Sequence, residues 1–249
     1  MRSLKCALMM FALVGTAAAQ SADPPIADTR LTVHTLLRED IFSGFFDNNM
    51  DRVARAEQNI ELLRKQRPGE EASLQAWKGG AALQRAVRAN DAGKPDEFAR
   101  YFQEARDAFA AAAKLSTGRD GVAAITGGSY VFFGDRLPKE HRAAAWAQAY
   151  DAYAGLWKQQ AAGLDQMPVH FQGELLSGMA QSAQRTGRSD EAAQFIDRML
   201  TVLKDTPYEK GARQWKADPA SVATTNLTCK NCHSPGRLAN RIAALDKQQ

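Results

Sequence analysis

The spacing of apolar residues constrains the fold of this chain more than any other feature of its sequence. Between residues 98 and 112, apolar side chains recur every three or four positions, which places them on one face of a helix: Phe98, Tyr101, Phe102, Ala105, Phe109 and Ala112. Alanine, leucine, glutamate, glutamine and arginine are frequent, and they favour helices. Alternation suited to a strand is seen at most in Ser129 to Phe133. We therefore predict an all-α fold.

The predicted helices also repeat along the chain. An alanine followed four residues later by a large apolar residue recurs every 43 to 49 residues, as Ala56 and Ile60, Ala105 and Phe109, Ala149 and Tyr153, and Ala192 and Ile196. Each of these helices follows another that has a glycine near its middle: Gly44, Gly80, Gly128 and Gly178. A small residue on the first helix lets the second pack closely. This pattern predicts stacked antiparallel helical hairpins over residues 31–205.

The last hairpin resembles a tetratricopeptide repeat. The residues at the offsets of that family are Leu176, Met179, Ala180, Ala183, Gly187, Ala192, Ile196 and Met199, with Ser189 and Asp190 placed to cap the second helix. Leu176 stands where that family most often has tryptophan, and Pro207 comes three residues late. The resemblance implies a curved stack with a concave surface that could hold a partner or the C-terminal segment. An ordinary helical bundle is the alternative within the same class.

The first nineteen residues have the pattern of an export signal. Arg2 and Lys5 precede an apolar stretch, and Ala17 to Ala19 form a small-residue cleavage site before Gln20. We expect cleavage there, a periplasmic product and a flexible segment over residues 20–30; an uncleaved anchor is the alternative. No later apolar run is long enough to span a membrane.

The charge of the chain gives little support for nucleic-acid binding. The formal charge is +4, and cleavage of the signal removes Arg2 and Lys5, which lowers it by two. The rest of the chain has no basic stripe interleaved with aromatic residues, which nucleic-acid recognition would favour. We expect no nucleic-acid partner.

Two cysteines near the C-terminus form the motif that carries chemistry. Once Cys6 is lost with the signal, Cys229 and Cys232 are the remaining cysteines, and His233 follows directly. This spacing is the one used to attach haem c. On a helical turn the two thiols lie side by side for thioether bonds to the haem vinyl groups, and the imidazole projects towards the iron. We therefore predict one covalent haem c, with His233 as the proximal iron ligand.

Two other kinds of site remain open for this motif. Cys229 and Cys232 could form a disulfide, as in thiol redox enzymes, but those enzymes place the pair after a strand, and none is predicted here. A zinc site would need a second cluster of ligands, which the scattered histidines do not form.

Residues 229–233 resemble the attachment motif of c-type cytochromes. Sixteen residues follow His233, and none is methionine or histidine, so the chain differs from the small cytochromes in which a downstream methionine is the sixth ligand. A C-terminal motif behind helices looks like the four-helix cytochrome c′ class, where the sixth position is often open. This chain is much longer and its helices repeat, so the resemblance covers Cys229, Cys232 and His233 only.

The sixth ligand must come from upstream or be absent. An open or water-occupied position is one expectation, and His170, which follows Met167 and Pro168 at a predicted helix start, is the other main candidate. His34 could face a pocket but also suits a core position, and His141 lies among charged residues and is expected to be solvated. Met179 and Met199 are expected to pack in the core.

The segment 206–249 differs from the repeats before it. We predict an irregular connector from Thr206 to Thr228, because the stretch contains prolines, a glycine and a polar run. Ser234 and Pro235 could start a terminal helix that carries Leu238, Ile242 and Leu245 on one stripe.

These features predict a one-electron carrier rather than an enzyme. Residues 204–249 contain eight basic and four acidic residues, which would steer an acidic redox partner towards the haem. The alternative is that these charges only keep a solvated tail soluble. The alternatives are a haem protein or enzyme that binds peroxide, nitric oxide or carbon monoxide at an open iron, and a helical-repeat adaptor. The sequence does not indicate an oligomeric state.

Overall fold

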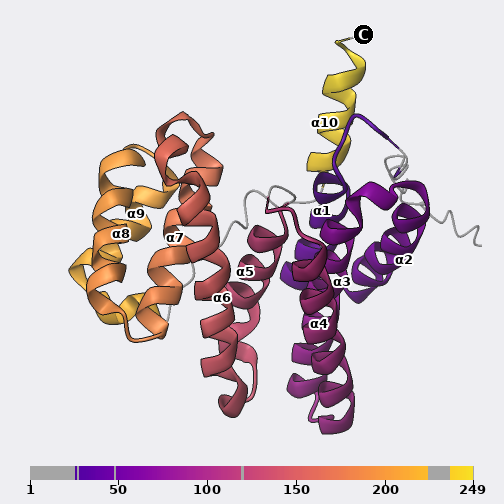
Figure 1. The fold of residues 1–249 in the computed structure, drawn as a ribbon, viewed down its shortest axis with the longest axis horizontal. Helices are drawn as coiled ribbons and strands as arrows, with labels where there is room; N and C mark the ends of the chain where they lie inside the picture. Colours follow the sequence, from indigo (N-terminus) through magenta and orange to yellow (C-terminus); the bar gives the residue numbers. More distant parts are fainter. Residues whose placement is uncertain (1–25, 27, 48, 119–120, 224–235, 249) are drawn as a thin grey trace, which may run out of the picture.

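A computed structural model describes residue 26 and residues 28–47, 49–118, 121–223 and 236–248. Over these residues the chain is helical with no strand, which confirms the predicted all-α class (Figure 1). The α-helices are α1 (Val33–Phe46), α2 (Met50–Gln66), α3 (Glu71–Asp91), α4 (Pro95–Leu115), α5 (Val122–Phe133), α6 (Lys139–Gln160), α7 (Val169–Arg185), α8 (Ser189–Val202), α9 (Pro207–Ala217) and α10 (Arg237–Asp246). Short 3₁₀ helices are η1 (Pro68–Glu70), η2 (Gly134–Arg136), η3 (Ala161–Gln166) and η4 (Pro219–Ala223).

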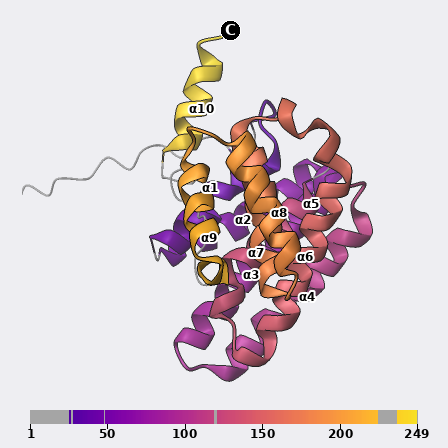
Figure 2. The same cartoon turned by 90° about the vertical axis from the view of Figure 1, so that its left-hand side faces the viewer.

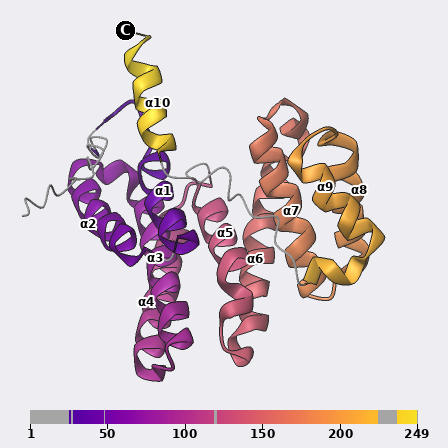
Figure 3. The ribbon, with the colours of Figure 1, turned by 180° about the vertical axis from the view of Figure 1, so that it is seen from behind.

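The first eight helices form stacked hairpins, as the repeats predict. Helices α1 and α2, α3 and α4, α5 and α6, and α7 and α8 pack in pairs. The first helix of each pair also packs against the first helix of the next, so that α1, α3, α5 and α7 form one continuous layer. Figure 3 shows this succession from behind, with α2 at one end of the stack and α8 and α9 at the other.

The repeated alanine and its large partner form the core of each second helix. All eight of these residues are buried, at α2, α4, α6 and α8: Ala56, Ile60, Ala105, Phe109, Ala149, Tyr153, Ala192 and Ile196. Because they recur one turn apart on the same face, each second helix presents the same ridge to its first helix. The repeat predicted from the sequence therefore corresponds to a packing repeat.

The predicted glycine contacts are correct in the first hairpin and displaced by one residue in the second. A Cβ atom on Gly44 would lie 2.6 Å from Val53 of α2, so this glycine permits the predicted close approach. In the second hairpin it is Gly79, not Gly80, that faces the partner helix, since a Cβ there would lie 2.7 Å from the Phe109 ring. Gly80 faces α5 instead.

Tyr153 of α6 shows that a glycine can also join successive hairpins. A Cβ on Gly127 of α5, its own first helix, would lie 2.9 Å from the Tyr153 ring, and one on Gly178 of α7 would lie 2.4 Å from it. The ring is thus held between the backbones of two helices. Gly178, predicted to admit α8, admits α6 of the preceding hairpin.

The possible strand from Ser129 to Phe133 is wrong, because this segment is the last part of α5. The Ser129 hydroxyl donates to the carbonyl of Ile125, one helical turn earlier, at 2.7 Å. Ser129, Tyr130, Val131 and Phe133 are all buried. Since α5 packs against α3, α6 and α7, burial on several sides hides the helical period that a half-exposed helix would show.

The predicted irregular connector is also wrong over residues 207–223, where α9 and η4 lie. Pro207 occupies the first turn of α9, a position in which proline costs no hydrogen bond. Gly211, Ala212 and Trp215 are buried at helical spacing, and α9 packs against α8. The proline and glycine that suggested a loop therefore serve a helix start and a close helix contact. Residues 224–228 of the predicted connector lie outside the described residues.

The predicted terminal helix is confirmed as α10, which packs on the first hairpin. Ile242 is buried with residues of α1 and α2, and Leu238 and Leu245 pack against the same cluster. Glu39 of α1 accepts hydrogen bonds from the backbone N–H groups of Gly236 at 2.9 Å and Leu238 at 2.7 Å. A carboxylate at a helix N-terminus is favourable. The remainder of α10 projects beyond the hairpins (Figure 2).

None of the helices within the described residues is long and apolar enough to cross a membrane.

Candidate functional site

The three residues of the predicted haem motif, Cys229, Cys232 and His233, lie outside the described residues, as does the predicted signal over residues 1–19. The described chain ends on one side of the motif with η4 and begins again on the other with Gly236. The structure therefore describes the surroundings of the motif through these two flanking ends.

Both ends are fixed to the layer of first helices. Arg185 of α7 donates a hydrogen bond to the carbonyl oxygen of Val222 in η4 at 2.5 Å. At the other end, Glu39 of α1 accepts from the backbone of Gly236 and Leu238. The segment that contains the motif is thus attached to α7 before it and to α1 after it.

The same two helices carry the histidines considered as iron ligands. His34 of α1 has its ring centroid 5.2 Å from that of Trp77. Burial lowers the pKa of His34 to about 4, and the positive charges of Arg38 and His170 lower it further. The last effect requires His34 and His170 to lie within reach of each other's charge, although they belong to the first and the fourth hairpin. At neutral pH His34 is uncharged and has a lone pair for a metal.

His170 lies in the first turn of α7, as predicted, and is half-buried. Its Nδ1 is 3.3 Å from the hydroxyl of Tyr208 in α9, and its Nε2 is 3.6 Å from a carboxylate oxygen of Glu174. Burial raises the pKa of Glu174 to about 7, and Arg38 of α1 opposes this rise. We call the group formed by His34, Arg38, His170, Glu174 and Tyr208 the α1–α7 site.

Aromatic side chains line the first helices beside this site. Phe42 of α1 meets Trp77 edge to face at 5.6 Å and the Phe132 ring at 5.6 Å, and Phe46 meets Phe132 at 4.9 Å. The indole Nε1 of Trp77 is buried without a hydrogen-bond partner among the described residues. Apolar rings beside a neutral imidazole suit a porphyrin, whose plane is apolar and whose iron takes nitrogen ligands.

A metal held by described residues alone is not indicated. In residues 26, 28–47, 49–118, 121–223 and 236–248 there is no group of three or more histidine, cysteine, aspartate or glutamate side chains that could hold an ion. An iron at the α1–α7 site would therefore need its principal ligands from elsewhere, which a porphyrin and His233 would supply.

The remaining candidates for the sixth ligand lie away from this site or inside the core. His141 is not solvated as predicted: it is half-buried, with its ring centroid 4.8 Å from that of Phe102 and 5.5 Å from that of Phe98. Met179 and Met199 are fully buried in the core, as predicted. Their thioethers pack among apolar residues.

No family model matches this chain, and no match is found among curated proteins or solved structures. Its function must therefore be argued from its own residues.

Sequence reasoning missed three members of the site: Arg38, Glu174 and Tyr208. Arg38 and Glu174 come from hairpins separated by more than a hundred residues, and Tyr208 lies in a segment predicted to be irregular. The one available signal was the position of His170 and Glu174 one turn apart, which places both on the same face of α7.

Proposed function

We propose that this chain is an exported mono-haem c-type cytochrome that transfers one electron to or from a redox partner. Cys229 and Cys232 would hold one haem c covalently, and His233 would be its proximal ligand. The periplasm is the proposed compartment and an acidic protein the proposed partner. The haem supplies the one-electron chemistry, while the helical stack binds it, orients it and limits access of water.

One observation carries this proposal furthest: the segment with the motif is attached to α1 and α7, and these are the helices that bring histidines together. Arg185 and Glu39 hold the two described ends of that segment. His34 and His170 interact electrostatically between the same helices. Arg185 is fifteen residues from His170 along α7, about 22 Å, so a haem attached at residues 229–233 would have to reach from the C-terminal end of α7 towards its N-terminal end to meet the imidazole.

His170 is the sixth ligand that the contacts favour over His34. Metal-ligating histidines commonly have their second ring nitrogen hydrogen-bonded, which fixes the orientation of the ring. Tyr208 provides such a partner for Nδ1 of His170. Nε2 would then bind the iron in place of its 3.6 Å contact with Glu174. For His34 the packing partner is the Trp77 ring. We therefore propose that His170, together with His233, would bind the haem iron.

A haem-based ligand-binding protein is the second candidate, and Glu174 is the observation that favours it. A carboxyl group with a pKa of about 7 can hold or release a proton at neutral pH. Together with Arg38, it would place a proton and a positive charge beside a bound peroxide or nitric oxide if the iron were open on that side.

The test of haem attachment compares cysteine variants of the full chain, exported together with the cytochrome c maturation machinery. Cys229→Ala/Cys232→Ala should lose covalent haem staining on a denaturing gel completely, because both thioether bonds are removed. Cys6→Ala, inside the predicted signal, is the matched control and should keep the stain. An unstained wild-type protein would refute the proposal.

Optical spectra of histidine variants separate the two candidate functions. If His170 is the sixth ligand, the reduced wild-type protein shows the sharp bands of low-spin iron and His170→Ala becomes high-spin and binds carbon monoxide. His34→Ala should stay low-spin. A wild-type spectrum that is already high-spin would favour the ligand-binding function instead.

A further inference from the structure

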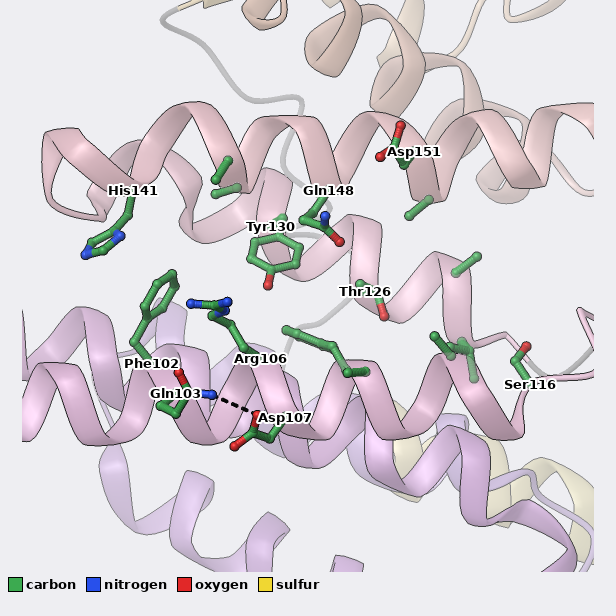
Figure 4. A pocket seen from close by; sticks show the side chains of 18 residues that line it. Phe102, Gln103, Arg106, Asp107, Ser116, Thr126, Tyr130, His141, Gln148 and Asp151 are labelled. Carbon is green, nitrogen blue, oxygen red and sulfur yellow. Dashed lines mark hydrogen bonds between the residues drawn. The ribbon is translucent and has the colours of Figure 1, made fainter.

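A groove on the other layer of the stack lies between α4, α5 and α6, far from the haem motif in sequence. Its volume is about 670 Å³. Helices α4 and α6 form its walls and α5 its floor, as Figure 4 shows. Ala110 and Ala113 of α4 and Ala144 and Ala152 of α6 line it. Because these side chains end at Cβ, the space between the two walls is left open. We call it the α4–α6 groove.

Several polar groups point into this groove without a partner among the described residues. They are the guanidinium of Arg106, the hydroxyl of Tyr130 and the side-chain amide of Gln148. The hydroxyl oxygen of Thr126 is buried and accepts or donates no hydrogen bond within the described chain. Burial raises the pKa of Tyr130 to about 12, so its hydroxyl remains a donor at physiological pH. Of these groups, Tyr130 and the Thr126 hydroxyl oxygen are buried, while Arg106 and Gln148 are exposed on the groove walls. Buried polar groups without partners are uncommon in proteins, and a bound ligand is one explanation for the two buried hydroxyls.

The groove has opposite charges in its two halves. Arg106 lies in the half that contains Phe102 and His141, and Asp151 lies in the half that contains Thr126 (Figure 4). His141 and Asp151 are ten residues apart on α6, which corresponds to about 15 Å along the helix. A second carboxylate, Asp107, is already engaged, since it accepts a hydrogen bond from Gln103 at 2.8 Å.

We propose that the α4–α6 groove binds an elongated zwitterion, with its carboxylate at Arg106 and Tyr130 and its cationic end at Asp151. The middle of the ligand lies along Thr126 and Gln148, which offer hydrogen bonds to amide groups. A free tripeptide is the simplest ligand of this class, because three extended residues span about 10 Å. The alanine-lined walls leave room for its side chains.

Three forms of one probe test both ends of the groove. The probe is the tripeptide Ala-Leu-Ala, used free, amidated at its C-terminus and acetylated at its N-terminus, and its binding to the mature full-length protein is followed by NMR titration. The free form should saturate the protein. Each blocked form should bind about three- to tenfold more weakly, because one charge-assisted contact near the surface is lost. Absence of saturable binding of the free form, or equal affinity of all three, would overturn the proposal.

Variants then assign each end of the probe to a residue. Arg106→Gln should weaken the free peptide about three- to tenfold and remove the difference between free and amidated forms. Asp151→Asn should instead remove the difference between free and acetylated forms. Lys114→Gln, on α4 but outside the groove, is the matched control for a lost charge and should bind as wild type does. If Arg106→Gln still discriminated the amidated form, the assignment would be wrong; thermal unfolding of each variant confirms that it is folded.

Discussion

The α1–α7 site and the α4–α6 groove lie in different hairpins of one stack: the site joins the first helices of the first and fourth hairpins, and the groove lies between the second helices of the second and third. First helices bring large side chains together at the α1–α7 site, where the Trp77 ring packs against the half-buried His34 and Phe42 meets both Trp77 and Phe132. At the α4–α6 groove, second helices are separated by alanines and leave an open space. The comparison shows that one stack of hairpins can bring large rings together at one site and leave a groove open at another.

The two places also differ in the environment of their polar groups. At the α1–α7 site His34 and Glu174 are half-buried, and burial lowers the pKa of the first and raises the pKa of the second. In the groove, the exposed Arg106 side chain faces open space. Partly buried ionisable groups with shifted pKa values make the stability of the fold depend on pH. Polar groups that face an open groove are instead available to a ligand.

The largest effect on stability should follow from removing the Trp77 side chain at the α1–α7 site. Trp77 is almost fully buried and contacts both His34 and Phe42. Trp77→Ala should lower the free energy of unfolding by about 3–5 kcal/mol, because it removes apolar contacts and leaves a cavity. Denaturant unfolding followed by circular dichroism measures this.

The control for Trp77→Ala is Phe171→Ala, since the Phe171 side chain is 54% exposed. It should change the free energy of unfolding by less than about 0.5 kcal/mol. If Trp77→Ala lowered the free energy of unfolding by less than about 1 kcal/mol, Trp77 would not be closely packed at the α1–α7 site.

The next effect is a pair of opposite pH dependences within the same site. His34 titrates at about 4 in the folded protein against 6.5 ordinarily, so the unfolded chain binds its proton first and stability rises with pH between about 4 and 6.5. Glu174 titrates at about 7 against 4.5, so the folded chain keeps its proton longer and stability falls as pH rises from about 4.5 to 7. In the wild type the two effects largely cancel.

Substituting one of the two residues should reveal the pH dependence of stability that the other produces. Glu174→Gln leaves the His34 effect, so stability should rise by about 1–3 kcal/mol from pH 4 to 6.5. His34→Gln leaves the Glu174 effect, and stability should fall by about 1–3 kcal/mol from pH 4.5 to 7. Urea unfolding at each pH, in the Cys229→Ala/Cys232→Ala background without covalent haem, measures both. Parallel pH profiles in the two variants would show that the groups are not buried together.

The fold followed from the sequence where a repeated apolar face is buried and the opposite face is exposed. The repeat of Ala105 and Phe109 at Ala149 and Tyr153 located second helices, and these residues are buried as expected. The prediction failed for α5, where burial on several sides removes the helical period, and for α9, where Pro207 and Gly211 have helical roles. Helix α5 lacks an ordinary exposed face, whereas α9 has one, with Arg213 and Lys216 exposed, and was missed because its proline and glycine are also typical of loops.

The candidate site could be predicted only where its members are close in sequence. His170 was found because it starts a helix, and its neighbour Glu174 lies one turn away. Its relation to His34 and Arg38 depends on the path of four stacked hairpins, which is set by many small contacts such as that of Tyr153 with Gly178. No spacing in the sequence encodes that distance.

The smallest effect should follow from filling the open groove. Ala110 is exposed on α4 and lines the groove, and leucine is nearly as favourable as alanine in a helix. Ala110→Leu should therefore change the free energy of unfolding by less than about 0.5 kcal/mol. The same substitution at Ala180, which is fully buried in α7, should cost about 1–3 kcal/mol because the packed core must make room. Thermal and urea unfolding of the two variants give the comparison directly. If Ala110→Leu proved as costly as Ala180→Leu, the groove would be closed in solution and its contrast with the packed core would fail. If Ala110→Leu is tolerated, the added side chain should occupy part of the groove. It should then weaken binding of the free tripeptide.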